Sequence, residues 1–493
     1  MTSRASVSAG NLLIRGGYVL TMDSAGDLPG ADVLVRDGVI QQIGRNLDVP
    51  DAEVIDASGK IVAPGLVDTH WHMWNTLLRG MSDGRPGWLA RPMAKGAIVS
   101  GAQASPYLPG GRPPVPPVPS VPPVPPEGYS PDRSGYFATC VGIGRHFLPG
   151  DTYAGTRLAA AEAVDAGITT VHDWAHNIRG LDWAEAGLRA LGESGLRARF
   201  SYGYQTGHAN DQLMALDDLA VIKAGWPSYH ADNRIHLGMA WRGTGGSNPA
   251  MRVAPELYRA EIAAARAHGL PVSVHACGPA GAAGQIRTYA DEGLLGPDLQ
   301  LVHLNNASPE EIALAAEAGT PVSVSPWTEL QIGYGQPVTG ELLAAGLSVG
   351  LSVGLSVDTT MLSGNADLFA VMKVTQACAN GQARHEFALT ARDVLRLATI
   401  EGARSLGLDA VTGSLAVGKR ADVIVVSLDS PSLGVLTDPA RLLVTAATPR
   451  DVELVLVDGR VLKRDGKLTI VDAKEITSGA RAALAGVFSR AAA

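Results

Sequence analysis

The sequence predicts an α/β protein in which a (β/α)8 TIM barrel is joined to a small β-domain built from both ends of the chain. Three observations predict this fold. In the middle of the chain, apolar runs rich in β-branched residues alternate with helical stretches rich in Ala, Leu and Glu. Both ends carry short strand patterns separated by turn residues. The length of 493 residues suits one large barrel with a smaller satellite.

Short strand patterns occupy both ends of the chain. Their alternating apolar residues are interrupted by Gly-Gly, Asp-Gly and Ser-Gly pairs, which are typical of hairpin turns. The predicted strand regions are residues 12–22, 32–44, 53–63, 421–430 and 452–471. We expect a β-domain of residues 1–60 and 410–475, a barrel of residues 61–409 and a helical tail of residues 476–493.

The middle of the chain reads as a parallel sheet with crossover helices. The eight candidate strands are residues 66–72, 167–174, 197–204, 234–241, 271–278, 299–306, 321–326 and 351–358. The helical stretches between them include residues 154–167, 255–269, 308–319 and 339–346. Each of these stretches ends at a glycine, as helix C-termini often do. Eight such units fit a closed barrel, whose inner strands are continuously apolar.

Two segments depart from this pattern. Residues 105–132 are rich in proline and are expected to be extended in polyproline II form. Because this insert follows the first barrel strand, we expect a mobile loop near the barrel mouth; an active-site lid or a ligand for a proline-binding domain are the alternatives. The second segment is the tandem Leu-Ser-Val-Gly repeat at 347–354, whose four extra residues preserve the two-residue alternation of a strand.

Composition excludes several classes of function. The net charge of -8 and the absence of a Lys/Arg cluster argue against a nucleic-acid partner, since phosphate binding needs a basic face. The three cysteines, Cys140, Cys277 and Cys378, form no CxxC pair, so neither a disulfide framework nor a thiolate zinc site is expected. The sequence has neither a signal-peptide pattern nor an apolar run long enough for a membrane span. We therefore expect a soluble cytoplasmic protein with no membrane partner.

His70 and His72 end the first predicted barrel strand. Residues two apart on a strand point to the same face, and in a barrel that face is turned inward, at the end where active sites lie. Three later strands also end in residues that bind metals: His275, His303 and Asp358. These side chains are expected to converge on one rim. Imidazoles with a carboxylate suit zinc or ferrous iron better than calcium or magnesium.

Several segments together resemble the amidohydrolase superfamily, in the branch that holds cytosine, guanine and S-adenosylhomocysteine deaminases and the triazine hydrolases. Residues 61–72 resemble its first-strand motif, and His275, His303 and Asp358 match its later motifs. Further similar segments are residues 159–174 at the second strand, 325–338 in the seventh-strand loop and 413–426 at the return into the β-domain. The resemblance spans almost the whole chain. It implies a distorted barrel with a β-sandwich made from both termini, and members often form homo-oligomers.

The resemblance also implies a mechanism. His70, His72, His275 and Asp358 would bind one divalent metal ion, zinc first and iron as the alternative. Such an ion lowers the pKa of a water molecule toward about 7. Asp358 would accept the proton of that water, and His303 would stabilise the charge that develops on the substrate. Attack on an electron-poor carbon bonded to nitrogen would then release ammonia or an amine.

The chain departs from the deaminase pattern at one position. Deaminases of this branch carry a glutamate three residues after the fifth-strand histidine, where it moves protons to the substrate. Here that position is Gly278, which has no group that can carry a proton. Glu329 and Asp173 are the candidate replacements, although Glu329 is more simply explained as a solvated loop charge.

Further residues are candidates for a substrate pocket. Trp74, Trp327, Glu329 and His176 are assigned to substrate binding, because aromatic rings near strand ends can stack on a planar heterocycle. His172, Asp173, His208, Trp71 and Trp241 have weaker claims and are equally well explained by packing or structural hydrogen bonds. Cys277 is expected to be inert.

The first hypothesis is a hydrolase that deaminates a nitrogen heterocycle as a small-molecule substrate. Gly278 leaves open a second hypothesis, metal-dependent hydrolysis of another bond, such as a cyclic amide or an aryl halide. A third hypothesis is a non-catalytic metal-binding scaffold that interacts through the proline-rich segment.

Overall fold

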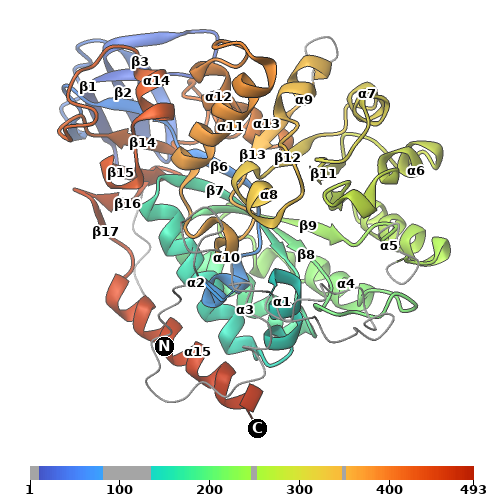
Figure 1. Cartoon of the computed structure of the whole chain (residues 1–493). Coiled ribbons are helices and arrows are strands. Elements are labelled where there is room, and N and C mark those ends of the chain that lie inside the picture. The colour runs from blue at the N-terminus through green and yellow to red at the C-terminus, as the bar shows by residue number, and fades with distance from the viewer. Residues whose placement is uncertain (1–9, 82–134, 246–251, 347–350, 493) are drawn as a thin grey trace, which may run out of the picture.

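The computed structural model describes residues 10–81, 135–245, 252–346 and 351–492. Eight parallel strands form one sheet in chain order, and helices surround them (Figure 1). The strands are β6 (Leu66–Trp71), β7 (Ile168–Ala175), β8 (Arg197–Tyr202), β9 (Ile235–Trp241), β10 (Val272–Ala276), β11 (Leu299–His303), β12 (Val322–Val324) and β13 (Val353–Leu355). The predicted (β/α)8 barrel is confirmed, and each of its strands lies within or overlaps a predicted apolar run.

The barrel closes between β6 and the residues that follow β13. The backbone N–H of His72 donates to the carbonyl of Asp358 at 2.7 Å, and the N–H of Asp358 donates to the carbonyl of His70 at 3.0 Å. The buried Asp68 carboxylate adds a third link, because it accepts a hydrogen bond of 3.0 Å from the N–H of Val357. The first and last strands are therefore held together where the predicted metal ligands lie.

A second sheet of nine strands brings both ends of the chain together. Strand β14 pairs antiparallel with β5, and β5 pairs parallel with β1, so N-terminal and C-terminal strands share one sheet (Figure 1, upper left). Its strands are β1 (Leu12–Leu20), β2 (Asp27–Arg36), β3 (Val39–Gly44), β4 (Glu53–Asp56), β5 (Ile61–Pro64), β14 (Val423–Val426), β15 (Val452–Val457), β16 (Arg460–Arg464) and β17 (Lys467–Leu468). This sheet is the β-sandwich part of the predicted fold.

Asp-Gly pairs make the hairpin turns of this sheet, as predicted. Asp37 and Gly38, between β2 and β3, have φ angles of 50° and 75°, which is the conformation of a type I′ turn. The prediction was wrong at Gly16 and Gly17, which do not end a strand. They form a bulge inside β1, where the backbone of Gly17 packs against the side chain of Val62 too closely for any Cβ atom.

Helices cover the outside of the barrel. The main ones are α2 (Pro149–Asp165), α3 (Leu181–Ser194), α4 (Leu216–Ala224), α5 (Pro255–Ala267), α6 (Gln285–Asp291), α7 (Pro309–Glu317), α9 (Thr339–Gly346) and α11 (Leu368–Ala383). Others are η1 (Met73–Leu78), α1 (Tyr136–Gly144), α8 (Pro326–Ile332), α10 (Thr360–Ser363), α12 (Ala391–Leu397), α13 (Ile400–Ser405), α14 (Pro439–Thr445) and α15 (Ala473–Ala492). Gly167, Gly269 and Gly319 follow helices with φ angles of 83°, 63° and 65°, which fits their predicted role at helix ends.

A buried ion pair joins the barrel to the second sheet. Arg197, the first residue of β8, donates to the carboxylate of Asp422 at 2.7 and 3.1 Å, and both side chains are almost fully buried. Arg197 also lies 3.5 Å from Asp458. Because this contact sits at the N-terminal end of a barrel strand, it belongs to the stabilising face of the barrel, opposite the predicted site.

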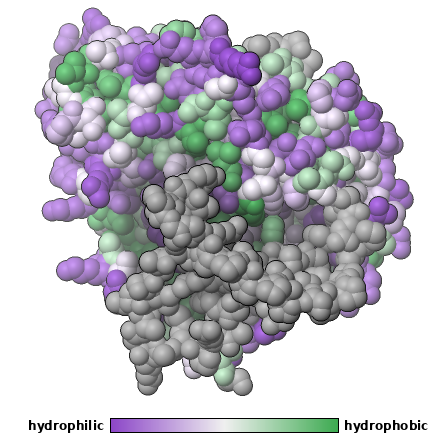
Figure 2. Space-filling model, in the orientation of Figure 1, coloured by the Kyte–Doolittle hydropathy of each residue, from purple (hydrophilic) through white to green (hydrophobic). Residues whose placement is uncertain are grey.

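The proline-rich segment 105–132 and residues 347–350 of the repeat lie outside the described residues. Residues 351–354, the second copy of the repeat, lead into and form part of β13. The described part of the surface in Figure 2 is mostly hydrophilic, with hydrophobic residues in small groups. Among the described helices, none combines the length and the apolar composition that a bilayer span requires.

Candidate metal centre at the barrel mouth

Four potential metal ligands meet at the C-terminal ends of the barrel strands. His70 and His275 are the last residues but one of β6 and β10, His303 ends β11, and Asp358 follows β13. One ligand atom from each of these residues lies within 4.8 Å of all the others. The side chain of His72 reaches the same group, because its Nε2 lies 3.3 Å from Oδ1 of Asp358. The five residues that the sequence predicted to converge are therefore neighbours.

The spacing of these atoms fits a metal ion. The Nε2 atoms of His70 and His275 are 3.2 Å apart, and Nε2 of His70 is also 3.2 Å from Oδ1 of Asp358. Ligands about 2.0 Å from a tetrahedral zinc ion stand about 3.3 Å from one another. Two imidazole nitrogens at this distance need a proton or a cation between them, so the donor set suits zinc or another borderline metal.

Burial and charge set the protonation of this group. Burial lowers the pKa of His70 to about 3 and lowers that of His275 well below its ordinary value, so both imidazoles are neutral and free to bind a cation. Burial alone would raise the pKa of Asp358, but hydrogen bonds with His70 and His72 hold it well below its usual range. Neutral imidazoles beside an ionised carboxylate are the protonation states that metal ligation requires.

The backbone is strained where these side chains are presented. His303 and Asp358 have φ angles of 85° and 60°, and Cys277, directly after β10, has 49°. Residues other than glycine seldom adopt this left-handed region, and such strain is common at active sites. Each of three strands thus ends at or is followed by a residue in an unfavourable conformation, and two of these residues, His303 and Asp358, belong to the ligand group.

Glu329 is buried, so its interpretation as a solvated loop charge was wrong. It lies in the first turn of α8, and its Oε1 lies 3.2 Å from Nδ1 of His303 while accepting a 2.7 Å hydrogen bond from the N–H of Ser325. Its Oε2 accepts from Asn305 at 3.2 Å. Burial alone would lower the pKa of His303, but Glu329 and Asp358 raise it above its ordinary value. Glu329 therefore fixes the orientation of His303 and favours a proton on its Nδ1.

Tyr334 occupies the space beside Gly278, and sequence reasoning missed it. A Cβ atom on Gly278 would stand 2.9 Å from the Tyr334 ring. The same ring contacts the His303 ring edge-on, with centroids 5.3 Å apart. Asn306 links the segments that carry Gly278 and Tyr334, because its side-chain amide donates to the carbonyl of Gly278 at 2.5 Å and to that of Tyr334 at 3.0 Å. Position 278 is small because a phenol fills the volume that a longer side chain would need.

Aromatic residues also pack against His72 and His275. The ring of Trp174, another residue that sequence reasoning did not select, lies 4.3 Å from the His275 ring and 5.3 Å from the His72 ring. His176 packs edge-on against His72 at 4.4 Å and accepts a 3.2 Å hydrogen bond from the indole N–H of Trp74. His176 therefore contacts both the ring of His72 and that of Trp74. Trp327, on α8, is 40% exposed.

The residues with weaker claims to the substrate pocket have contacts or burial that fit a structural role. His172 bridges the carbonyl of Thr69 and the hydroxyl of Ser201, at 2.9 and 2.8 Å. Asp173 is buried, and burial raises its pKa to about 7. Burial raises the pKa of the Cys277 thiol to about 11, which agrees with an inert cysteine. Trp71 and Trp241 are fully buried among core residues.

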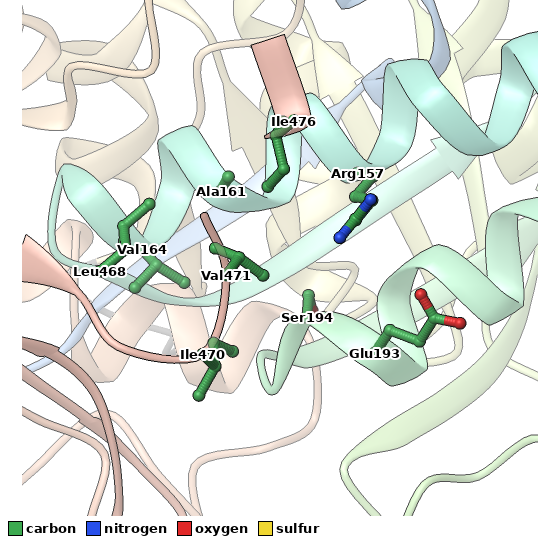
Figure 3. A pocket seen from close by; sticks show the side chains of 9 residues that line it. All are labelled: Arg157, Ala161, Val164, Glu193, Ser194, Leu468, Ile470, Val471 and Ile476. Carbon is green, nitrogen blue, oxygen red and sulfur yellow. The ribbon is translucent and has the colours of Figure 1, made fainter. Parts of the chain in front are cut away.

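Two pockets lie outside this group. One is lined by residues of α2, α3, β17, α15 and the segment between β17 and α15, including Arg157, Glu193 and Ile476, and has an empty volume of about 430 Å³ (Figure 3). It contains no predicted site residue. The other has an empty volume of about 520 Å³ and is lined by residues that follow β7 and β8, among them Arg179, Tyr204 and His208.

Comparisons with known proteins identify the family of the chain. The sequence pattern of the amidohydrolase family matches residues 61–462. A 5′-deoxyadenosine deaminase of Methanothermobacter thermautotrophicus is 28% identical over 444 residues, which cover 87% of this chain and 88% of the relative. A 5-methylthioadenosine/S-adenosylhomocysteine deaminase of Halobacterium salinarum is 29% identical over 429 residues, covering 85% and 84%.

Solved structures share the whole fold. An adenosine deaminase from Xanthomonas campestris with bound zinc has a TM-score of 0.76 at 22% identity, covering 97% of this chain and 99% of the other. An atrazine chlorohydrolase from Arthrobacter aurescens in complex with zinc has a TM-score of 0.77 at 22% identity, covering 96% and 100%. The family pattern covers most of the chain, and the chain belongs to the amidohydrolase family.

Proposed function

We propose that this protein is a metal-dependent deaminase that hydrolyses a C–N bond of a nitrogen heterocycle. The observation that carries the proposal is the convergence of His70, His275, His303 and Asp358 at the barrel mouth. The deaminase names of relatives that match most of the chain add to it. The buried thiols of Cys140 and Cys277 and their lack of a disulfide suit the reducing cytoplasm, where we place the protein.

The metal centre is assigned to His70, His72, His275 and Asp358. Zinc is the first candidate, because the donor set is three imidazoles and one carboxylate, and iron is the second. When bound, the ion supplies an activated water molecule at neutral pH. The neutral state of His70 and His275 leaves their lone pairs available for this ion.

Side chains of the protein carry out the remaining steps of the proposed reaction. Asp358 accepts a proton as the water oxygen bonds to the ring carbon, and this proton ends on the leaving nitrogen when the C–N bond breaks. His303, oriented by Glu329, donates a hydrogen bond to the negative charge that develops on the substrate. The reaction consumes one water and releases one ammonia.

In this proposal, Tyr334 takes the place of the glutamate that deaminases of this branch carry where this chain has Gly278. Burial, and then the carboxylates of Asp358 and Glu329, raise the pKa of its phenol, so the hydroxyl keeps its proton at neutral pH. Its ring lies against His303 and over Gly278. We assign the hydroxyl as a hydrogen-bond donor to the ring nitrogen or leaving group of the substrate.

The substrate-binding residues proposed from the sequence divide into two kinds. Trp327, half exposed on α8, suits direct stacking on a planar ring. His176 acts through His72, against which it packs, and Trp74 acts through His176, to which its indole N–H donates a hydrogen bond. Glu329 acts through His303.

Gly278 also favours a second candidate, hydrolysis of another bond, such as a cyclic amide or an aryl halide. An aryl halide loses a halide ion, which needs no proton, so its hydrolysis does not require an acid at position 278. Product analysis separates the two candidates, because only deamination releases ammonia.

A screen of zinc-loaded protein against purines, pyrimidines, pterins and triazines tests the proposal. We expect ammonia release that disappears on chelation and returns with zinc. Turnover that persists after complete metal removal overturns it, and turnover without ammonia supports the second candidate.

A further inference from the structure

The second pocket lies on the same face of the barrel as the metal ligands. It is lined by residues 178–180 after β7, residues 202–205 at the end of β8, and His208, Gln212, Leu213 and Ala215 in the loop before α4. Active sites of such barrels are built from the loops that follow the strands, so this pocket is placed to receive part of a substrate.

Only two ring contacts separate the pocket from the metal ligands. Tyr204, which lines the pocket, packs against Trp174 with ring centroids 5.8 Å apart. Trp174 in turn lies 4.3 Å from the ring of His275. The pocket therefore lies next to the metal ligands, with the rings of Tyr204 and Trp174 between it and His275.

Arg179 brings a charge without a partner into this pocket. Its Nε is buried, and within the described part of the chain it makes no hydrogen bond. Other buried guanidinium groups in the described structure have a partner: Arg197 pairs with Asp422 and Arg242 with Glu261. Arg199 and Arg234, whose Nε atoms are also unpaired, each donate to a backbone carbonyl, of Leu406 and Leu196. A guanidinium group that is partly removed from water and has no partner costs free energy, which a bound anion would recover.

The surroundings of Arg179 are positive rather than negative. Burial and the neighbouring charge of Arg145 both lower its pKa. Arg145 itself donates to His146, whose pKa is lowered by burial and then by Arg145 and Arg179. No aspartate or glutamate is among the described residues that line the pocket. Asp218, outside that lining, accepts a hydrogen bond from Tyr202 at 3.4 Å.

We propose that Arg179 and this pocket form a subsite for an anionic arm, a carboxylate or a phosphate, on the heterocycle that the enzyme hydrolyses. Arg179 would hold the anion through its guanidinium group, whose fork of N–H donors matches the oxygens of either group. Tyr204 and Gln205 supply polar groups beside it. The inference rests on the proposed function and narrows its substrate class to heterocycles that bear an acidic substituent.

Matched substrate pairs test this subsite. Pterin is compared with pterin-6-carboxylate, and 5′-deoxyadenosine with adenosine 5′-monophosphate, as substrates of the zinc-loaded enzyme. In the wild type, the anionic member of the pair that is turned over should have the lower KM. In Arg179→Gln, the KM of that member should rise about 10- to 100-fold, the usual effect of losing a hydrogen bond to a charged group. The kcat of either member should stay within about twofold.

The control variant is Arg189→Gln, which removes an equal charge from an exposed position on α3. It should change neither KM. Equal KM values for both members of a pair in wild type and Arg179→Gln would overturn the subsite while leaving the deaminase proposal intact. If no compound is turned over, calorimetry with the same anions and zinc-loaded protein decides: binding that Arg179→Gln abolishes supports the subsite, and unchanged or undetectable binding overturns it.

Discussion

Tyr334 and Gly278 form a matched pair: the ring of the tyrosine fills the space into which a side chain at position 278 would project. A Cβ atom on Gly278 would stand 2.9 Å from that ring, and the ring also lies 5.3 Å from that of His303. The ring of Tyr334 thus accounts for the absence of a side chain at position 278, and that absence leaves room for the ring. An acid at position 278 and a phenol at position 334 are alternative ways to fill one volume beside the metal ligands.

Tyr334→Phe tests the proposed role of the phenol. The variant keeps the ring that packs against Gly278 and removes only the hydroxyl, so the fold and zinc content should not change. We expect kcat to fall about 100-fold, as when one donor to a transition state is lost, with a smaller change in KM. Tyr229→Phe, which removes a hydroxyl that donates to Glu185 and has no proposed role in the site, is the control. Wild-type kcat in Tyr334→Phe would contradict the assignment.

An exchange of the two side chains tests the shared volume. Gly278→Glu alone should lower the melting temperature, because the new side chain meets the Tyr334 ring. Adding Tyr334→Gly should restore part of the stability, and the glutamate then has room to restore turnover. A double variant that is no more stable than Gly278→Glu would show that the two positions are independent.

Glu329→Gln tests whether Glu329 positions His303. The amide keeps the size of the side chain but removes the charge beside Nδ1 of His303. We expect kcat to fall about 10- to 100-fold with zinc content unchanged, the usual cost of losing a residue that orients a group at a metal site. Glu386→Gln, at an exposed position, is the control. A parallel loss of zinc would instead indicate that Glu329 supports metal binding.

The sequence predicted that these candidate ligands converge, because the positions of residues at strand ends follow from the fold. A residue that ends an apolar run in a barrel must lie at the rim, so His275, His303 and Asp358 could be brought together without coordinates. The eight strands were predicted for the same reason, since buried strands and amphipathic helices have distinct patterns.

The residues that surround the ligands could not be predicted this way. Tyr334 is placed by the turn that ends α8 at Gly333, where its N–H donates to the carbonyl of Glu329. The burial of Glu329 depends on hydrogen bonds from Ser325 and Asn305, which no spacing rule gives. The bulge at Gly17 depends likewise on its contact with Val62, a residue of another strand.

Removal of the metal tests the ligand assignment through stoichiometry and stability. His275→Ala and Asp358→Asn should each reduce bound zinc from about one ion per chain to near zero, because each removes one donor from a small set. Chelation of the wild type should lower its melting temperature, since a ligand that binds the native state stabilises it. His385→Ala, at an exposed position, should keep its zinc. Full zinc occupancy in His275→Ala would contradict the assignment.

The buried pair between Arg197 and Asp422 should stabilise the junction of barrel and sheet without affecting turnover. Asp422→Asn leaves the Arg197 charge buried with only the 3.5 Å contact to Asp458, so we expect the free energy of unfolding to fall by about 3 to 5 kcal/mol. The partly exposed pair of Arg266 and Asp298 provides the comparison, where Asp298→Asn should cost about 1 kcal/mol. Chemical denaturation measures both, and equal losses would contradict the expectation.

Asp173 gives the protein a pH-dependent stability that Asp173→Asn should remove. Burial raises the pKa of this carboxyl from its ordinary value of 3.8 to about 7. The folded protein therefore holds a proton that the unfolded chain releases above pH 3.8, so the stability linked to Asp173 is present at low pH and lost as the pH rises to about 7. A shift of this size corresponds to about 4 kcal/mol.

The asparagine is neutral at every pH, so the stability of Asp173→Asn relative to wild type should increase from pH 4.5 to pH 7.5. Denaturation of both proteins at several pH values measures this difference, and a difference that does not change with pH would show that the carboxyl titrates normally.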